Sequence, residues 1–291
     1  MNQIKPSVMK VNTLSSYLKS IIQKLFCFMI FILVSNYAHG QSYEKEFKVY
    51  FAWEVKQLDE FIERFNDDEF TFIKGYIKKT EGITNMSREV MIKKLFNTGR
   101  TNWNYNEIST FIKQVNDKES PQFLDSEKGE WFANVRCITE FNGKPMNVLL
   151  KLKLKSLVNG GAKWVIEDVS SLQDSGIFGN SHEDNNAVKC PSPVNPEISL
   201  NPMSHAIDFM NIDLVTNKPD NIGNFVDTTS HKNKNLNLFI DACLKKQLKV
   251  LRAMSITYDF YQIKGWRIEV KQFNRQSKNS GWLISRLVKI S

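Results

Sequence analysis

The sequence predicts an α+β protein in which helices pack on a curved, cone-like antiparallel sheet, divisible into two related lobes. Between residues 51 and 99, apolar residues recur at intervals of three and four, which is the period of an amphipathic helix. From Trp131 onward they alternate with other residues, which is the period of a strand. After a polar, proline-bearing segment, the same order of helix and then strand returns. Helices followed by a strand meander are typical of the α+β class.

The helices come first along the chain. A shorter helix is predicted at 70–77, and a third begins after Ser87, a good N-cap residue, and ends at Gly99. Residues 103–115 are ambiguous between helix and strand. Five apolar residues lie on one face of the first helix, which has about four turns: Phe51, Val55, Leu58, Ile62 and Phe65.

Three antiparallel strands follow the helices. Residues 131–141 alternate, Asn142-Gly143 predicts a tight hairpin turn, and 148–155 form the second strand. Residues 159–161 predict another turn, and 163–169 form the third strand. In the middle strand the leucines face one side and three lysines face the other: Lys151, Lys153 and Lys155.

The second lobe repeats this order in shortened form. Helices are predicted at 204–210 and 235–246, and strands at 250–261, 265–273 and 281–290. Trp164-Val165-Ile166 resembles Trp282-Leu283-Ile284, which favours related lobes without proving a duplication. The predicted organisation is a signal peptide at 1–40, a first lobe at 41–171, a linker or long loop at 172–200 and a second, smaller lobe at 201–291.

This order of elements resembles the nuclear transport factor two-like (cystatin-like) superfamily of α+β cones. The resemblance covers residues 51–171 and, more weakly, 201–291, and it rests on element order. It implies a pocket inside the cone. Enzymes of that superfamily place a carboxylate or a histidine there, and no position of this sequence matches one.

The first forty residues predict export. Leu25 to Val34 is an apolar run of about half the length of a membrane-spanning helix, and it ends before Ala38-His39-Gly40. This pattern predicts a secretory signal peptide cleaved after Gly40, giving a periplasmic or secreted protein without a stable membrane span. An uncleaved anchor is the alternative. The basic residues of this segment precede the apolar run: Lys5, Lys10, Lys19 and Lys24.

The remaining chain carries a modest charge. Of the 39 basic residues, four lie in the signal peptide, so 35 face 31 acidic residues in the mature protein. This balance predicts no nucleic-acid partner.

Three cysteines remain in the mature chain. Cys137 and Cys243 lie on apolar patterns and are expected to be buried, whereas Cys190 lies in a polar stretch and is expected to be exposed. His182 and His205 flank Cys190 at spacings that match no metal motif. No G-x-S-x-G motif and no phosphate-binding loop occurs. We therefore predict no metal, no cofactor and no catalytic residue.

Two groups of residues are candidates for binding. Trp103 and Tyr105 stand among asparagines and suit a sugar ring or a protein partner, or else they fold back on the core. The row Lys151, Lys153 and Lys155 suits an anion, or else it is a solvated sheet face. The sequence thus predicts an exported, non-enzymatic module that binds an unknown small molecule, glycan or protein. The alternative is a small-molecule enzyme with ionisable residues inside the cone.

Overall fold

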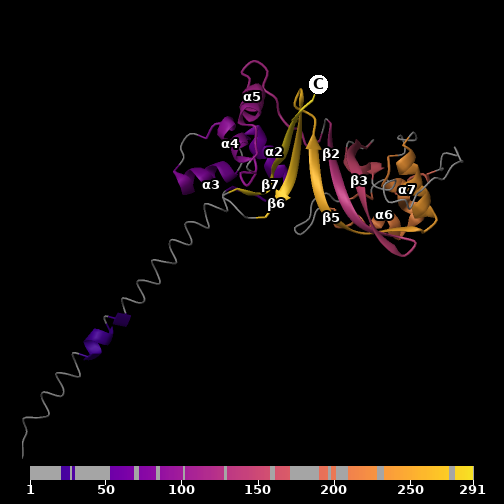
Figure 1. The fold of residues 1–291 in the computed structure, drawn as a ribbon, viewed down its shortest axis with the longest axis horizontal. Helices are drawn as coiled ribbons and strands as arrows, with labels where there is room; N and C mark the ends of the chain where they lie inside the picture. Colours follow the sequence, from indigo (N-terminus) through magenta and orange to yellow (C-terminus); the bar gives the residue numbers. More distant parts are fainter. Residues whose placement is uncertain are drawn as a thin grey trace, which may run out of the picture. The chain divides into compact units, whose positions relative to one another are not determined.

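The fold is that of a computed structural model, shown in Figure 1. The described residues are 21–26, 28–29, 53–68, 72–82, 86–100, 102–127, 130–157, 161–170, 190–195, 198–200, 209–227, 233–274 and 279–290. Trp53–Ser291 form one compact unit, and Met1–Ala52 form another.

Helices and strands both contribute to the unit Trp53–Ser291. The helices are α2 (Leu58–Asn66), α3 (Phe72–Glu81), α4 (Arg88–Lys94), α5 (Tyr105–Val115), α6 (Leu214–Asn217), the 3-10 helix η1 (Pro219–Asn224) and α7 (Lys234–Leu244). The strands are β1 (Glu54–Val55), β2 (Trp131–Phe141), β3 (Lys144–Ser156), β4 (Ala162–Ser170), β5 (Leu248–Phe260), β6 (Trp266–Phe273) and β7 (Ser280–Lys289).

The described strands form one mixed sheet of seven in the order β1-β7-β6-β5-β2-β3-β4. The short β1 pairs with β7 in parallel, and every other pairing is antiparallel. The predicted α+β class is therefore correct. The central ladder joins β2 to β5, from the pair Trp131 and Phe260 to the pair Phe141 and Leu248. The two stretches predicted as lobes thus share one sheet, and their origin by duplication stays a prediction.

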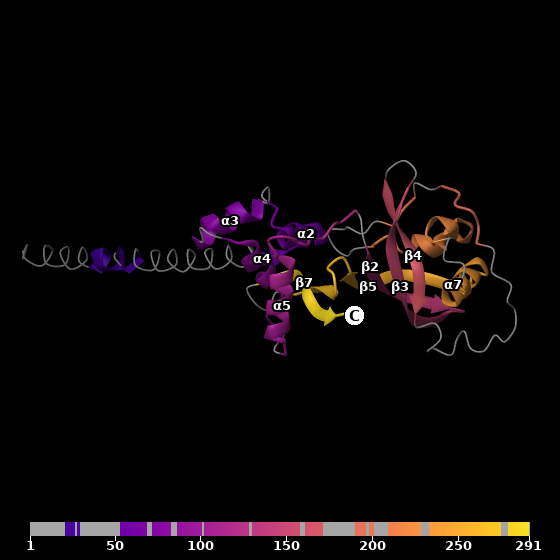
Figure 2. The same cartoon turned by 90° about the horizontal axis from the view of Figure 1, so that it is seen from above.

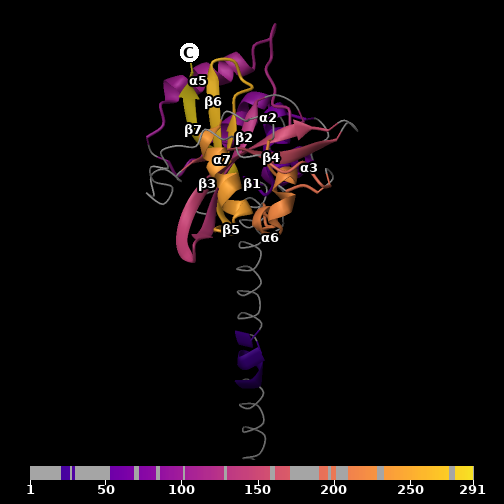
Figure 3. The same ribbon diagram turned by 90° about the vertical axis from the view of Figure 1, so that its right-hand side faces the viewer.

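The helices cover strands that are distant from them in the sequence (Figures 1 and 2). The early helices α2, α4 and α5 lie near β6 and β7, where the ring of Phe111 meets that of Trp266 edge-on at 5.5 Å. The later helices α6 and α7 lie at the other end of the sheet (Figures 1 and 2), which faces the viewer in Figure 3. There the ring of Trp164 of β4 meets that of Phe209 edge-on, with 5.6 Å between the ring centres. Each predicted lobe therefore covers strands of the other.

Several element boundaries differ from the predicted ones. The first helix begins at Leu58 rather than near Phe51, because Glu54 and Val55 pair with β7. The third helix ends at Lys94, well before Gly99, because Phe96 forms a bridge with Ile284 of β7. Both differences arise from pairing with a strand more than 180 residues away, which no local pattern encodes.

Most of the ambiguous segment 103–115 is helical: α5 begins at Tyr105 and ends at Val115. Asn104 is its N-cap, and its side-chain oxygen accepts hydrogen bonds from the backbone N–H groups of Asn106 and Glu107. Phe111 and Val115 are fully buried on its inner face. The cap and the buried stripe together favour the helix over a strand.

The buried positions mostly follow the predicted faces. Leu152 and Cys137 are fully buried on the inner face of the sheet, and Cys243 is buried in α7. The predicted exposure of Cys190 is wrong, because this residue is partly buried and packs against the core. The next residue, Pro191, approaches η1 closely: a Cβ atom added to Gly223 would lie only 1.9 Å from the carbonyl oxygen of Pro191. Pro191 and Asn195, in the described part of the predicted linker, therefore contact η1.

Gly281→Ala is expected to lower the free energy of unfolding by more than Gly143→Ala does. Both glycines have positive φ, 82° and 76°, so alanine introduces strain of about 1–2 kcal/mol at either position. Only at Gly281 would the new Cβ meet backbone, 1.9 Å from the carbonyl oxygen of Val55, whereas nothing lies within 4 Å at Gly143. Chemical denaturation of both variants is the measurement, and equal losses would contradict the close packing of β1 on β7.

Candidate functional site

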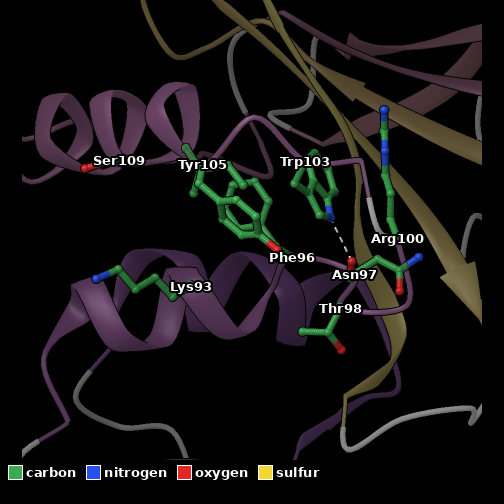
Figure 4. A pocket seen from close by; sticks show the side chains of 9 residues that line it. Lys93, Phe96, Asn97, Thr98, Arg100, Trp103, Tyr105 and Ser109 are labelled. Carbon is green, nitrogen blue, oxygen red and sulfur yellow. Dashed lines mark hydrogen bonds between the residues drawn. The ribbon is translucent and has the colours of Figure 1, made fainter.

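A pocket of about 370 Å³ lies between α4 and α5 (Figure 4). Its volume is at the lower end of the range for small-molecule sites, roughly 300–1,000 Å³. Side chains from α4, from α5 and from the connection between them line it: Lys93, Phe96, Asn97, Thr98, Arg100, Trp103, Tyr105, Ile108 and Ser109.

The connection between the two helices is fixed to the sheet. The backbone N–H of Asn97 donates to the carbonyl oxygen of Ile284 at 3.1 Å, and the N–H of Ile284 donates to Leu95 at 2.8 Å. These bonds hold Phe96 against β7, where it is almost fully buried. The floor of the pocket is therefore an extension of the sheet.

Arg88 fixes the opposite ends of the same helices. Its guanidinium group donates to the carbonyl oxygens of Phe65 at 2.9 Å, of Val115 at 3.0 Å and of Gln122. The first two carbonyls belong to the last turns of α2 and α5, where a cation is favourable. Burial lowers the pKa of Arg88, against the smaller opposite effect of Asp67. A single side chain at the start of α4 thus joins three helices.

Trp103 is held in a defined orientation. Its indole N–H donates to the carbonyl oxygen of Asn97 at 2.8 Å, and its ring meets that of Phe96 edge-on at 5.2 Å. The guanidinium carbon of Arg100 lies 4.5 Å from the centre of the indole ring. Arg100 itself donates to the carbonyl oxygen of Ser285 at 2.6 Å and to Asn102 Oδ1 at 2.7 Å. Trp103 therefore packs partly on the core, which is one of the two predicted alternatives.

Tyr105 lies in the same pocket but is free of the core. Its side chain is 72% exposed, and within the described residues this side chain makes no hydrogen bond, ion pair or ring contact. The pair singled out from the sequence is thus brought together, with one residue anchored and the other presented to solvent. Phe96 and Lys93, which also line the pocket, were not singled out, because each fits an ordinary helical pattern.

The pocket has an apolar centre and polar ends. Figure 4 shows the rings of Phe96 and Tyr105 between the two helices, with Lys93 and Ser109 toward one end and Arg100 toward the other. Such a site can hold a ring at its centre and hydrogen-bond the substituents of that ring. None of the lining side chains carries a carboxylate.

The predicted lysine row faces carboxylates. Lys151 and Lys153 each lie 3.1 Å from Glu167, and Lys153 and Lys155 lie 2.6 and 3.3 Å from Asp227. The pKa of Lys153 is raised: burial opposes the charged form, but the hydrogen bonds to Asp227 and Glu167 outweigh it. The side chain of Asp227 is only 1% exposed. An added anion at this row would have to compete with these carboxylates.

A second hollow, polar and about 580 Å³ in volume, lies on the sheet face over β2, β5 and β6. Asp259 and Glu269 line it and are opposite one another in the β5–β6 ladder. Asn134 Nδ2 donates to Asp259 Oδ2 at 2.8 Å, and Ser285 Oγ donates to Glu269 Oε1 at 2.6 Å. The sequence does not point to Asp259 and Glu269 as a pair, because the alternation of a strand does not reveal which residues of neighbouring strands share a hollow.

The pKa values of Asp259 and Glu269 are shifted in opposite directions. Burial raises the pKa of Asp259, and the nearby Glu269 adds to this, against the smaller effect of Arg267. Burial also acts to raise the pKa of Glu269, but the hydrogen bonds from Ser285 and Lys271 outweigh it and leave the pKa lowered. Paired groups with diverging pKa values are a feature of acid–base sites, and also of structural ion-pair networks.

Within the described residues, the cysteine thiols are not activated and no cluster of metal-binding side chains is found. Burial raises the pKa of Cys137 to about 12 and also raises those of Cys190 and Cys243, so the thiolate form is disfavoured. Within the described residues, no three His, Cys, Asp or Glu side chains gather as metal ligands would. The histidines weighed from the sequence, His182 and His205, lie outside those residues.

Fold and site together define an α+β protein with a ligand-sized aromatic pocket beside the sheet. Comparisons with protein-family models, with curated proteins and with solved structures find no match for this chain. None of the helices that the structure describes is both long and apolar enough to cross a membrane. Of the predicted signal peptide, only residues 21–26 and 28–29 are described, and they are helical.

Asp259→Asn is expected to raise the stability of the protein at pH 7, because a raised pKa means that the folded state favours the protonated acid. Ionisation then costs stability as pH rises above the unfolded value of 3.8, and the amide removes this cost. Glu269→Gln should act in the opposite direction. Its lowered pKa contributes stability above the unfolded value of 4.5, which is lost as pH falls through the folded pKa.

Urea denaturation of both variants between about pH 4 and pH 7 measures these effects. The difference between Asp259→Asn and the parent protein should grow with pH and be small at the acidic end. A stability loss for Asp259→Asn that is the same at every pH would show that the carboxylate is structural.

Proposed function

We propose that the protein is an exported, non-enzymatic binding module that holds a small ring-bearing ligand between α4 and α5. The observation that carries this proposal is Tyr105. A large aromatic side chain that is 72% exposed and has no partner in the described structure contributes little to the fold. It stands at the mouth of an apolar pocket of ligand size, beside the anchored Trp103.

The surroundings of Tyr105 support a preformed site. Phe96 is tied to β7, Trp103 is tied to Asn97, and Arg88 fixes the far ends of both helices. A ligand that enters such a pocket orders few side chains, so little of its contact energy is lost. Aromatic side chains with neighbouring polar groups are typical of small-molecule sites.

The resemblance to the nuclear transport factor two-like superfamily remains part of the proposal, as an expectation about the fold alone. It is supported by the α+β class and by helices that pack on a largely antiparallel sheet. The proposed site lies between two helices, however, and does not depend on a cone-shaped interior. Binding at this pocket can therefore be tested independently of the resemblance.

The pocket is expected to bind 8-anilinonaphthalene-1-sulfonate, a fluorescent probe with aromatic rings and one negative charge. Tyr105→Ala should weaken this binding roughly twofold to tenfold, since one aromatic contact contributes about 0.5–1.5 kcal/mol. The free energy of unfolding should change by no more than about 0.5 kcal/mol, because the side chain is exposed. Fluorescence titration of the folded, full chain measures the dissociation constant.

Val194→Ala provides the matched control, because Val194 is also exposed, at 70%, and does not line the pocket. This variant should bind the probe as the parent protein does. Equal binding by Tyr105→Ala and the parent protein would refute the proposed site.

Export is the second part of the proposal, and it is supported by the basic, apolar and small-residue pattern of residues 1–40. Expression in a secreting bacterial host should yield a mature protein that begins at Gln41. Mass spectrometry of the exported fraction measures this terminus. Recovery of the chain with residues 1–40 attached to a membrane would favour the uncleaved anchor instead.

An enzyme that uses the sheet-face hollow is the second candidate function. It is favoured by one observation, the opposite pKa shifts of Asp259 and Glu269, which would suit an acid and a base. Urea denaturation of Asp259→Asn and Glu269→Gln as a function of pH tests whether the two pKa values are shifted in this way. A carboxyl group that is retained at a cost to stability is consistent with a chemical role, whereas one that stabilises the fold needs no such role.

A further inference from the structure

We propose that the ligand of the pocket between α4 and α5 is an acidic sugar ring, such as a uronate residue of a saccharide. This inference rests on the proposed function of the same pocket and adds the chemical class of the ligand. Three features carry it: the charge of the lining, the exposed aromatic ring and the polar groups at the two ends.

The lining is positively charged. Lys93 and Arg100 contribute two cations, and no lining side chain is acidic. Lys93 pairs with Glu89 at 2.6 Å, but both side chains are more than half exposed, so this pair contributes little to stability. The carboxylate of a ligand can take the place of Glu89 at small cost. Arg100 is already oriented by Ser285 and Asn102.

The aromatic centre suits the face of a sugar ring. The electron-rich face of an aromatic ring attracts the slightly positive C–H groups of a flat ligand. Tyr105 offers an exposed ring for such a contact, while Arg100 lies over the ring of Trp103. The ligand therefore meets Tyr105 first, with Phe96 and Ile108 around it.

The polar groups at the ends favour a sugar over an aromatic acid. The hydroxyl group of Ser109 makes no hydrogen bond within the described residues. Asn97 Oδ1 accepts a hydrogen bond from the backbone N–H of Gly99 at 3.0 Å. The side-chain NH₂ group of Asn97 can then donate to a ligand. Sugar hydroxyls can hydrogen-bond both groups, whereas the ring of benzoate carries no hydroxyl group and leaves them bonded to water.

Isothermal titration calorimetry of the full chain with digalacturonate and cellobiose tests the class. Both are disaccharides, and only the first carries carboxylates. Digalacturonate should bind about tenfold more tightly, as one charge-assisted hydrogen bond would provide. Its advantage should shrink as the salt concentration rises, because exposed charges are screened.

Two variants locate the charge effect. Lys93→Gln should reduce the affinity for digalacturonate by several-fold more than it reduces the affinity for cellobiose, because only the first ligand loses a charge pair. Lys113→Gln, on α5 and outside the pocket, should change neither affinity. Both lysines are exposed, so neither variant should affect folding.

The outcomes separate this inference from the proposed function. Equal affinities for the two disaccharides, or no binding of either, would overturn the acidic-sugar class, while the fluorescent probe still reports whether the pocket binds. Tighter binding of benzoate than of digalacturonate would also overturn the sugar class. Probe binding that does not depend on Tyr105 would overturn the proposed function itself.

Discussion

The pairing of β2 with β5 is the constraint on which the rest of the described structure depends. This ladder joins residues 131–141 to residues 248–260, and it is the only link in the described sheet between β3–β4 and β6–β7. Two irregularities of register interrupt it, and such bulges increase the local twist of a sheet. Trp131 and Phe260 stack at 5.2 Å where the ladder begins, so packing and pairing support one another there.

The candidate pocket is joined to this sheet by a series of backbone pairings. β5 pairs with β6, β6 with β7, and Ile284 of β7 holds Phe96 at the end of α4. At the other ends of α4 and α5, Arg88 donates hydrogen bonds to carbonyl groups in the last turns of α2 and α5. The walls of the pocket are therefore fixed at both ends by interactions that do not involve the ligand.

The sequence reveals those features that local patterns encode. The alternation of residues 131–141 and the Asn142-Gly143 turn correctly predict the β2–β3 hairpin, including the burial of Leu152. The helix at 103–115 could also have been recognised, because Asn104 and Glu107 have the spacing of a capping motif. Trp103 and Tyr105 were found because aromatic residues among asparagines fit no core period.

Features that depend on distant pairing could not be found in this way. β1 has only two residues, and its partner lies more than two hundred residues away. The carboxylate that faces Lys153 and Lys155 is Asp227, which a row of lysines in one strand does not reveal. Asp259 and Glu269 share a hollow only because β5 and β6 have a particular register. In each case the missing information is which strands or loops lie side by side.

Exposure alone does not distinguish a binding residue from a structural one, and two aromatic residues of this protein illustrate the difference. Phe123 is 51% exposed, but the guanidinium carbon of Arg88 lies 4.3 Å from the centre of its ring, so its position is explained by the fold. Tyr105 is more exposed and has no such contact in the described structure. Arg88 is itself held by three carbonyl groups, which links Phe123 to the helix ends. The fold accounts for the position of Phe123 but not for that of Tyr105, so Tyr105 is the aromatic residue on which the proposed binding site rests.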